Sequence, residues 1–95
     1  MRRTRYLLAY DIRDSGRLRL VHKTAKSYGF AMQYSVFVCD LTMGELCSLR
    51  FELDEIIEPT RDSVAIVPLG EGYDASLFEF MGVRPSLPLR GARIV

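Results

Sequence analysis

A run of consecutive apolar residues that ends on a carboxylate lies near the start of the chain. Residues 6–10 read Tyr-Leu-Leu-Ala-Tyr and are followed by Asp11. Continuous apolar character predicts a central strand that is covered on both faces. We expect this strand over residues 6–14, with Asp11 as the main chemical candidate at its C-terminal end. The alternative is that Asp11 or Asp14 only caps the helix that follows.

Two segments repeat apolar residues at spacings of three and four, which predicts amphipathic helices. The first covers residues 15–28, and Gly29 after it is expected to form a left-handed cap. The second follows Thr42, which forms a capping-box pattern with Glu45, and it ends before Pro59. The predicted buried stripes are Leu18, Val21, Ala25 and Tyr28 in the first helix, and Leu46, Leu49, Leu53, Ile56 and Ile57 in the second.

Three further segments predict strands. Residues 32–40 alternate with period two, which is typical of a strand with one more polar face. Residues 63–69 are nearly all apolar and predict a second central strand. Residues 76–81 alternate around Glu79 and predict a fourth strand. The expected order is therefore strand, helix, strand, helix, strand, strand.

These elements predict one α+β domain over residues 1–82. Central strands that connect to their neighbours through helices match a ferredoxin-like split βαβ sandwich of the βαββαβ type, an antiparallel sheet with both helices on one face. Pro85 and Pro88 exclude residues 83–95 from a central strand. We expect these residues to form an extended C-terminal tail that packs on a partner subunit, because a monomer would expose their apolar side chains.

Charge is segregated along the chain, although its sum over 95 residues is only +1. Residues 1–30 carry eight Arg and Lys against two Asp, residues 31–82 carry two Arg against ten acids, and residues 83–95 add three Arg. Such segregation indicates a polyanion partner or complementary self-association. Two solvated helix faces of opposite sign would give the same pattern.

The composition argues against several other classes. With 48% hydrophobic residues and no apolar run near the roughly 20 residues of a membrane span, we expect a globular, cytoplasmic protein with no membrane partner. Cys39 and Cys47 form no CxxC pair, which argues against a zinc site or a metal chaperone. We expect both thiols to be reduced and structural, and His22 to be a partly exposed helix residue or a phosphate contact. Residues 64–67 lack the aromatic side chains of an RNA-recognition motif.

Short motifs are spread over residues 6–69. They are Tyr10-Asp11-Ile12-Arg13-Asp14, Arg17-Leu18, Tyr28-Gly29-Phe30, Gln33-Tyr34-Ser35-Val36-Phe37, Asp62-Ser63-Val64 and Pro68-Leu69. At this spacing and in this order they resemble the CRISPR-associated protein two family. The resemblance implies a ferredoxin-like homodimer that acts in spacer acquisition with the CRISPR integrase, and for some members a metal-dependent endonuclease. Val38 departs from the family, which often has an acidic residue there, although Asp40 lies nearby.

The resemblance also implies roles for individual residues. Asp11 matches the family's metal-associated aspartate and is the expected catalytic and metal-binding residue, and Ser35 and Phe37 match its second-strand motif. Mg²⁺ commonly takes only one or two protein carboxylates, so we expect a Mg²⁺ ion shared between the two Asp11 of a dimer that activates water for phosphodiester cleavage.

Basic residues near Asp11 are the expected contacts to duplex DNA or single-stranded RNA. They are Arg13, Arg17, Arg19, Lys23 and Lys26. The residues leave open whether the nuclease, if active, is an endoribonuclease or a DNase. The alternative function is a non-catalytic ferredoxin-like module that binds nucleic acid or another protein.

Overall fold

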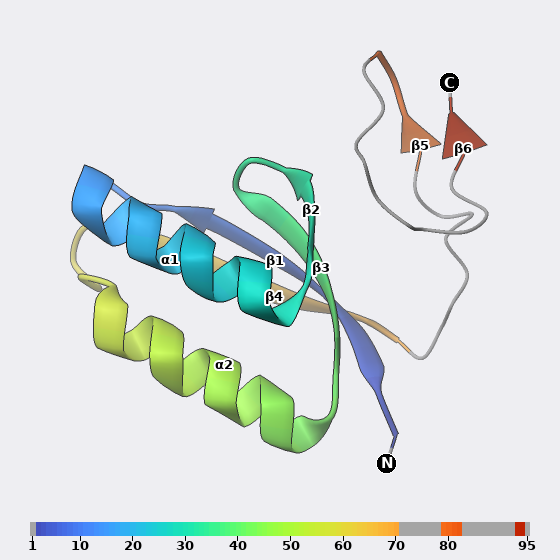
Figure 1. The fold of residues 1–95 in the computed structure, drawn as a ribbon, viewed down its shortest axis with the longest axis horizontal. Coiled ribbons are helices and arrows are strands. Elements are labelled where there is room, and N and C mark those ends of the chain that lie inside the picture. Colours follow the sequence, from blue (N-terminus) through green and yellow to red (C-terminus); the bar gives the residue numbers. More distant parts are fainter. Residues whose placement is uncertain (1, 71–78, 83–92, 95) are drawn as a thin grey trace.

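The computed structural model of the chain describes residues 2–70, 79–82 and 93–94. Its elements are β1 (Thr4–Asp11), α1 (Ser15–Tyr28), β2 (Phe30–Gln33), β3 (Val36–Leu41), α2 (Met43–Ile56), β4 (Ser63–Gly70), β5 (Glu79–Phe80) and β6 (Arg93–Ile94). The first four strands form one sheet in the order β2-β3-β1-β4, and all neighbours are antiparallel. This is the predicted ferredoxin-like βαββαβ fold (Figure 1). No helix among the described residues is long and apolar enough to span a membrane.

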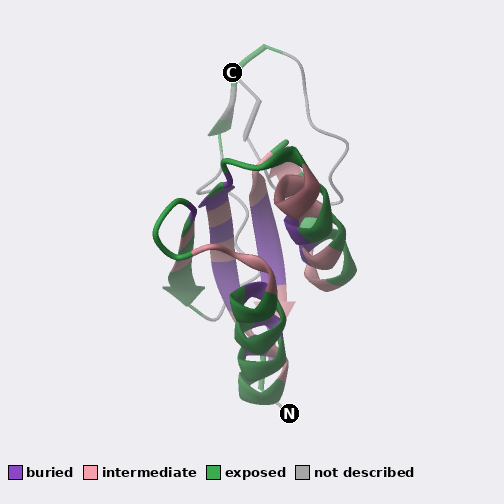
Figure 2. Ribbon diagram, turned by 90° about the vertical axis from the view of Figure 1, so that its left-hand side faces the viewer, coloured by how far each residue is buried: buried purple, intermediate pink, exposed green. Residues whose placement is uncertain are grey.

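The core lies between the two helices and one face of the sheet. Directly paired residues of antiparallel strands point to the same face, so the register groups Tyr6 and Leu8 of β1 with Cys39 and Phe37 of β3. All four are buried, and Figure 2 shows burial concentrated in the central strands while the outer helix surfaces are exposed. The predicted helix stripes are confirmed in this cluster: Val21, Ala25, Leu46, Leu49 and Leu53 are buried, and Leu18, Tyr28, Ile56 and Ile57 pack against them.

The opposite side of the sheet, which we call the helix-free face, also carries apolar residues. Leu7 and Ala9 of β1 lie on it in register with Val67 and Ala65 of β4. Leu7 and Ala9 are half-buried, whereas Ala65 is exposed and Val67 is 44% exposed. Both helices pack on the other side of the sheet, so the cover that was expected on both faces of the first strand is only partial on this face, where Leu7 and Ala9 are half-buried.

Both helices begin at hydrogen-bonded caps. The sequence left Asp11 and Asp14 as possible caps of α1, and the structure shows that Asp14 is the cap. Its Oδ2 accepts a hydrogen bond from the Arg17 amide at 2.9 Å. The capping box before α2 is confirmed: Thr42 N donates to Glu45 Oε1 at 2.8 Å, and Glu45 N donates to Thr42 Oγ1 at 3.2 Å. These bonds satisfy amides that the first turn of a helix leaves without partners.

Gly29 after α1 was predicted to be left-handed, and this is wrong. Its backbone is extended, with φ of −162° and ψ of −164°. A glycine is required there because of close packing: a Cβ at this position would lie 2.5 Å from Cys39 Sγ and closer still to the Val38 carbonyl oxygen. The end of α1 is thus pressed directly against β3.

The single strand predicted over residues 32–40 is two strands. β2 and β3 pair with each other through a turn at Tyr34 and Ser35. The alternation continues through this turn, and Ser35, its one residue of a type common in turns, is a weak signal that did not mark the reversal. The alternation predicted that Phe37 and Cys39 lie on the more polar face of this strand, but both side chains are fully buried.

The predicted order of the later strands is also wrong. Residues 63–69 were expected to form a central strand, but β4 lies at the edge of the four-stranded sheet. The strand expected over residues 76–81 lies partly outside the described residues, and Glu79–Phe80 pairs in parallel with Arg93–Ile94 in a separate two-stranded sheet. The fourth strand of the main sheet comes from the β2–β3 hairpin. Apart from β6, the tail over residues 83–95 lies outside the described residues, and so does its expected contact with a partner.

Candidate functional site

Asp11, the predicted catalytic residue, is the last residue of β1 and pairs with Ser63 of β4. Alternation along β1 places its side chain on the helix-free face together with Leu7 and Ala9. The Asp11 side chain is 67% exposed, and its Oδ2 lies 3.4 Å from Nη2 of Arg13, which is 63% exposed. The structure therefore offers a carboxylate to solvent, with one cation beside it.

Asp62 fixes the segment that follows Asp11. Its side chain is fully buried. Its carboxylate accepts from the amides of Arg13 at 2.9 Å and Glu58 at 2.8 Å, and from Nε and Nη2 of Arg17 at 2.7 and 3.1 Å. The hydrogen bond from Arg17 is the largest reason that the pKa of the Asp62 carboxyl is well below its usual range. These bonds tie the start of α1 to the loop before β4.

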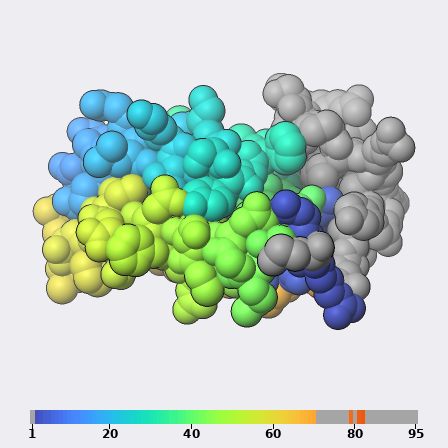
Figure 3. All heavy atoms as spheres, turned by 60° about the horizontal axis from the view of Figure 1, so that its bottom comes forward, coloured from blue at the N-terminus to red at the C-terminus, as the bar shows by residue number. Residues whose placement is uncertain are grey.

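The predicted cationic contacts fall into two groups. Arg17 forms an ion pair with Asp62 and its side chain is only 24% exposed, so its charge is already paired within the fold. Arg19, Lys23 and Lys26 are exposed and have no ion pair among the described residues. Their spacings of four and three place them on one side of α1, which we call the basic face. Figure 3 shows α1 and α2 side by side across one surface of the molecule.

A cluster of aromatic side chains holds the β2–β3 turn against the end of β1. The Tyr10 amide donates to the Ser35 carbonyl at 3.1 Å, and the Tyr10 hydroxyl donates to the Tyr34 carbonyl at 3.2 Å. The same hydroxyl lies 2.9 Å from Nδ1 of His22, whose ring stacks on Tyr34. Burial is the main cause that raises the pKa of Tyr10 to about 12, so the hydroxyl keeps its proton at neutral pH.

Sequence reasoning named some residues of this region and missed others. Ser35 lies in the turn beside β1, whereas Phe37 is a fully buried core residue. His22 is half-buried, in line with its predicted partial exposure. The parts played by Tyr10, Tyr34 and Asp62 were not predicted. The available signal was their presence in the motifs, because periodicity does not show which polar atoms meet in the fold.

The described residues of one chain do not enclose a metal ion. They contain no group of three or more His, Cys, Asp or Glu that could hold one. Asp11 supplies a single exposed carboxylate, which fits a Mg²⁺ ion that keeps most of its water and phosphate ligands but does not fit an ion coordinated by protein alone. Cys39 and Cys47 are both free, as predicted, but only Cys39 is buried. Burial is the main cause that raises its pKa to about 11.

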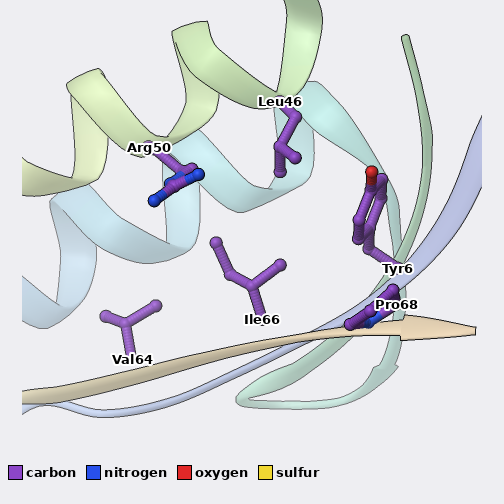
Figure 4. Close-up of a pocket in the computed structure, with 6 residues that line it drawn as sticks. All are labelled: Tyr6, Leu46, Arg50, Val64, Ile66 and Pro68. Carbon is purple, nitrogen blue, oxygen red and sulfur yellow. The ribbon is translucent and has the colours of Figure 1, made fainter. Parts of the chain in front are cut away.

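A groove of about 430 Å³ runs between α2 and β4. It is lined by Tyr6, Leu46, Arg50, Val64, Ile66 and Pro68 (Figure 4). A hollow of about 180 Å³ adjoins it and shares three of these residues. The walls are mainly apolar, and neither Asp11 nor the basic face of α1 contributes to them. The groove is therefore separate from the exposed carboxylate.

Comparison with known proteins gives consistent matches. The family described as CRISPR associated protein Cas2 matches residues 4–76. The chain is 42% identical to the CRISPR-associated endoribonuclease Cas2 2 of Thermodesulfovibrio yellowstonii, over 87% of this chain and 88% of that protein. It is 38% identical to the CRISPR-associated endonuclease Cas2 of Halalkalibacterium halodurans, over 87% of this chain and 91% of that protein.

Solved structures show the same similarity. A hypothetical protein from Thermus thermophilus superimposes with a TM-score of 0.76 at 32% identity, over 87% of this chain and 95% of that chain. Streptococcus pyogenes Cas2, crystallised at pH 6.5, superimposes with a TM-score of 0.67 at 32% identity, over 73% of this chain and 89% of that chain.

Proposed function

The chain belongs to the CRISPR associated protein Cas2 family, and on that basis we propose that it is a nuclease of CRISPR adaptation that binds nucleic acid through the basic face of α1 and cleaves phosphodiester bonds at Asp11. The observation that carries this proposal is the exposed Asp11 carboxylate, 3.4 Å from Arg13 and just before the helix that presents the basic face. The names endoribonuclease and endonuclease of two relatives support the same reaction class.

The proposed active form is a symmetric homodimer that pairs through the helix-free face. The half-buried and exposed apolar residues of this face, which include Ala9, Ala65 and Val67, supply the surface for such a contact. Because Asp11 belongs to the same face, a two-fold contact there brings both Asp11 carboxylates into one interface. Two nearby carboxylates repel each other, and a divalent cation relieves that repulsion.

Each group near the site has a part in the proposed reaction. The two Asp11 carboxylates would hold a partly hydrated Mg²⁺ ion, which when bound would supply an activated water and neutralise charge on the phosphodiester. The Arg13 guanidinium holds a phosphate beside Asp11, and the basic face of α1 binds other phosphates of the nucleic acid. Asp62 keeps the backbone of residue 13 and the start of α1 in position through its four hydrogen bonds.

A second candidate function is a non-catalytic subunit that binds nucleic acid and the CRISPR integrase during spacer acquisition. Two observations favour it. Each chain supplies only one exposed carboxylate at this position, and its neighbour Arg13 already balances the charge. The outer surface of α2 carries exposed acids, Glu52, Asp54 and Glu55, which suit a protein partner better than a phosphate backbone.

The first experiment tests catalysis with Asp11→Asn. The substitution preserves size and a carbonyl oxygen but removes the negative charge, so we expect the magnesium-dependent cleavage rate to fall by at least about a hundredfold while binding remains. Cleavage of labelled RNA and DNA is measured with and without Mg²⁺, beside Asp54→Asn as a matched exposed control. Absence of cleavage by the wild type with any divalent ion would leave the non-catalytic function, and a wild-type rate in Asp11→Asn would place the activity elsewhere.

The second experiment tests binding by replacing Arg19, Lys23 and Lys26 with Ala. Each lost phosphate contact reduces the slope of log affinity against log salt by about one unit, so we expect weaker binding of all sequences and a slope smaller by about two to three units. Fluorescence anisotropy over a salt series measures both quantities. Arg50→Ala on α2 is the control and should change neither. An unchanged slope in the triple variant would show that the basic face is an ordinary solvated surface that makes no phosphate contacts.

A further inference from the structure

Tyr34 combines high exposure with a fixed ring. It lies in the β2–β3 turn and is 67% exposed. One side of the ring stacks on His22, with centroids 4.9 Å apart and ring planes 14° apart. Since one face is covered by His22 and two thirds of the residue is still accessible, the other face of the ring is open to solvent.

The hydrogen bonds around Tyr10 explain why this arrangement is rigid. The Tyr34 carbonyl oxygen can only accept a hydrogen bond, so the Tyr10 hydroxyl uses its single proton to donate to this oxygen. The Tyr10 oxygen then accepts from Nδ1–H of His22, which sets the tautomer and the orientation of the imidazole. Phe37 packs edge-on against the same imidazole, with centroids 5.4 Å apart. The His22 ring is thus held from two sides and supports Tyr34 from beneath.

The turn is close to the proposed reactive carboxylate. The Ser35 carbonyl accepts from the Tyr10 amide, and Asp11 is the next residue of β1, one residue rise of about 3.3 Å further along the strand. The Tyr34 ring stacks on His22 of α1 and therefore lies on the helix side of the sheet, at the same end of β1 as Asp11, whose side chain points to the helix-free face.

We infer that the outer face of Tyr34 is a stacking platform for one unpaired nucleobase of a single strand that is bound on the helix side of the sheet. A base inside a duplex is already stacked on both faces and cannot use the platform, whereas an unpaired base can stack on an aromatic ring. Stacking depends little on base identity, so the platform selects for single-stranded structure and not for sequence. This inference rests on the proposed nucleic-acid binding and adds the structural class of the ligand.

The test uses single-stranded oligonucleotides that carry 2-aminopurine, whose fluorescence is quenched by stacking, at successive positions. Binding is measured in EDTA so that cleavage does not intervene. We expect binding to quench the probe with the wild type and with Tyr34→Phe, and loss of that quenching with Tyr34→Leu. Single-strand affinity should fall roughly 5- to 150-fold in Tyr34→Leu, with an unchanged salt slope, because stacking releases no counterions. Affinity for a blunt duplex should not change.

The matched control is Phe51→Leu, since Phe51 is equally exposed at 67% but lies on the acidic helix α2. It should alter neither affinity nor fluorescence. The platform is overturned if the wild type binds the oligonucleotides but quenches the probe at no position. This result does not depend on whether the variants fold. Unchanged affinity in a folded Tyr34→Leu overturns the platform too, and in both cases the basic face and the proposed function remain. A wild type that binds no nucleic acid overturns both together.

Discussion

Asp62 and Asp11 lie near each other in the fold but differ completely in their surroundings. Asp62 is buried and accepts four hydrogen bonds, whereas Asp11 is two-thirds exposed and, among the described residues, pairs with Arg13. A buried and fully hydrogen-bonded carboxylate is fixed in geometry and in charge. An exposed one can exchange its partner for a ligand. The proposed chemical role therefore fits the surroundings of Asp11, and a structural role fits those of Asp62.

The pH dependence of stability should report on Asp62. Its lowered pKa means that the unfolded chain, with an ordinary Asp pKa of about 4, binds the proton before the folded chain does. The stabilising contribution is therefore fully present above about pH 4 and is lost as pH falls toward the lowered folded value. We expect Asp62→Asn to melt several degrees lower at pH 7 and to lose less stability than the wild type below pH 4.

Thermal melts from pH 7 to pH 2 measure this difference. Asp54→Asn, an exposed carboxylate on α2, is the control and should follow the wild type throughout. Parallel pH profiles for the wild type and Asp62→Asn would contradict the assignment.

At this scale the sequence pointed to Asp11 as a candidate, because a carboxylate that follows an apolar run can be seen in the sequence alone, and its catalytic role stays a prediction. The sequence also named the cations of α1 that the structure shows as exposed, and their binding role stays a prediction as well. The sequence did not reveal that Arg17 is already bound, because its partner Asp62 is 45 residues away in the chain. The contact between Tyr10 and His22 was hidden for the same reason, since it joins a strand to a neighbouring helix.

Among the elements, the junction of α1 with β3 has the closest contact made at any glycine of the described residues. A methyl group at Gly29 would strike the Val38 carbonyl and Cys39 Sγ, and Val38 belongs to the backbone of a central strand that cannot easily move. We expect Gly29→Ala to destabilise the fold by about 1–3 kcal/mol and to lower the melting temperature by at least about 4 °C.

Gly44→Ala in the first turn of α2 is the matched comparison. The nearest atom to its new Cβ, Thr42 Oγ1, would be 3.9 Å away, so the melting temperature should stay the same or rise. A neutral Gly29→Ala would show that the end of α1 can shift away from β3.

Helices were easier to predict than strands in this chain. Caps and apolar stripes are local signals. Both helices start within about a residue of their predicted bounds, and they end within about two residues of them. Strand pairing is not local. The alternation over residues 32–40 fits one strand or two, and the antiparallel pairing of β2 with β3 shows that the chain reverses at Tyr34 and Ser35. The apolar run of residues 63–69 likewise gave no sign that β4 lies at an edge.

At the scale of the whole molecule, the helix-free face should control assembly. Val67 on this face is 44% exposed, and a Lys there would place a charge in the proposed dimer contact. We expect light scattering to show the mass of two chains for the wild type and of one chain for Val67→Lys. Cleavage should fall with the dimer, although Asp11 is intact, because the proposed site needs two carboxylates.

Leu20→Lys is the control, because Leu20 is 53% exposed on α1 and lies outside the helix-free face. It should remain dimeric. A monomeric wild type, or a monomeric Val67→Lys that cleaves at the wild-type rate, would remove the shared site.

The side-by-side placement of α1 and α2 has a consequence for the way the molecule approaches a partner (Figure 1). The exposed cations of α1 and the exposed acids of α2 give the described part of the molecule an electric dipole, although the net charge of the chain is only +1. The field of a polyanion exerts a torque on such a dipole and turns α1 forward within about 10 Å of the phosphates at 0.1 M salt. Rotation during diffusion therefore selects the orientation of encounter before any side chain touches a phosphate.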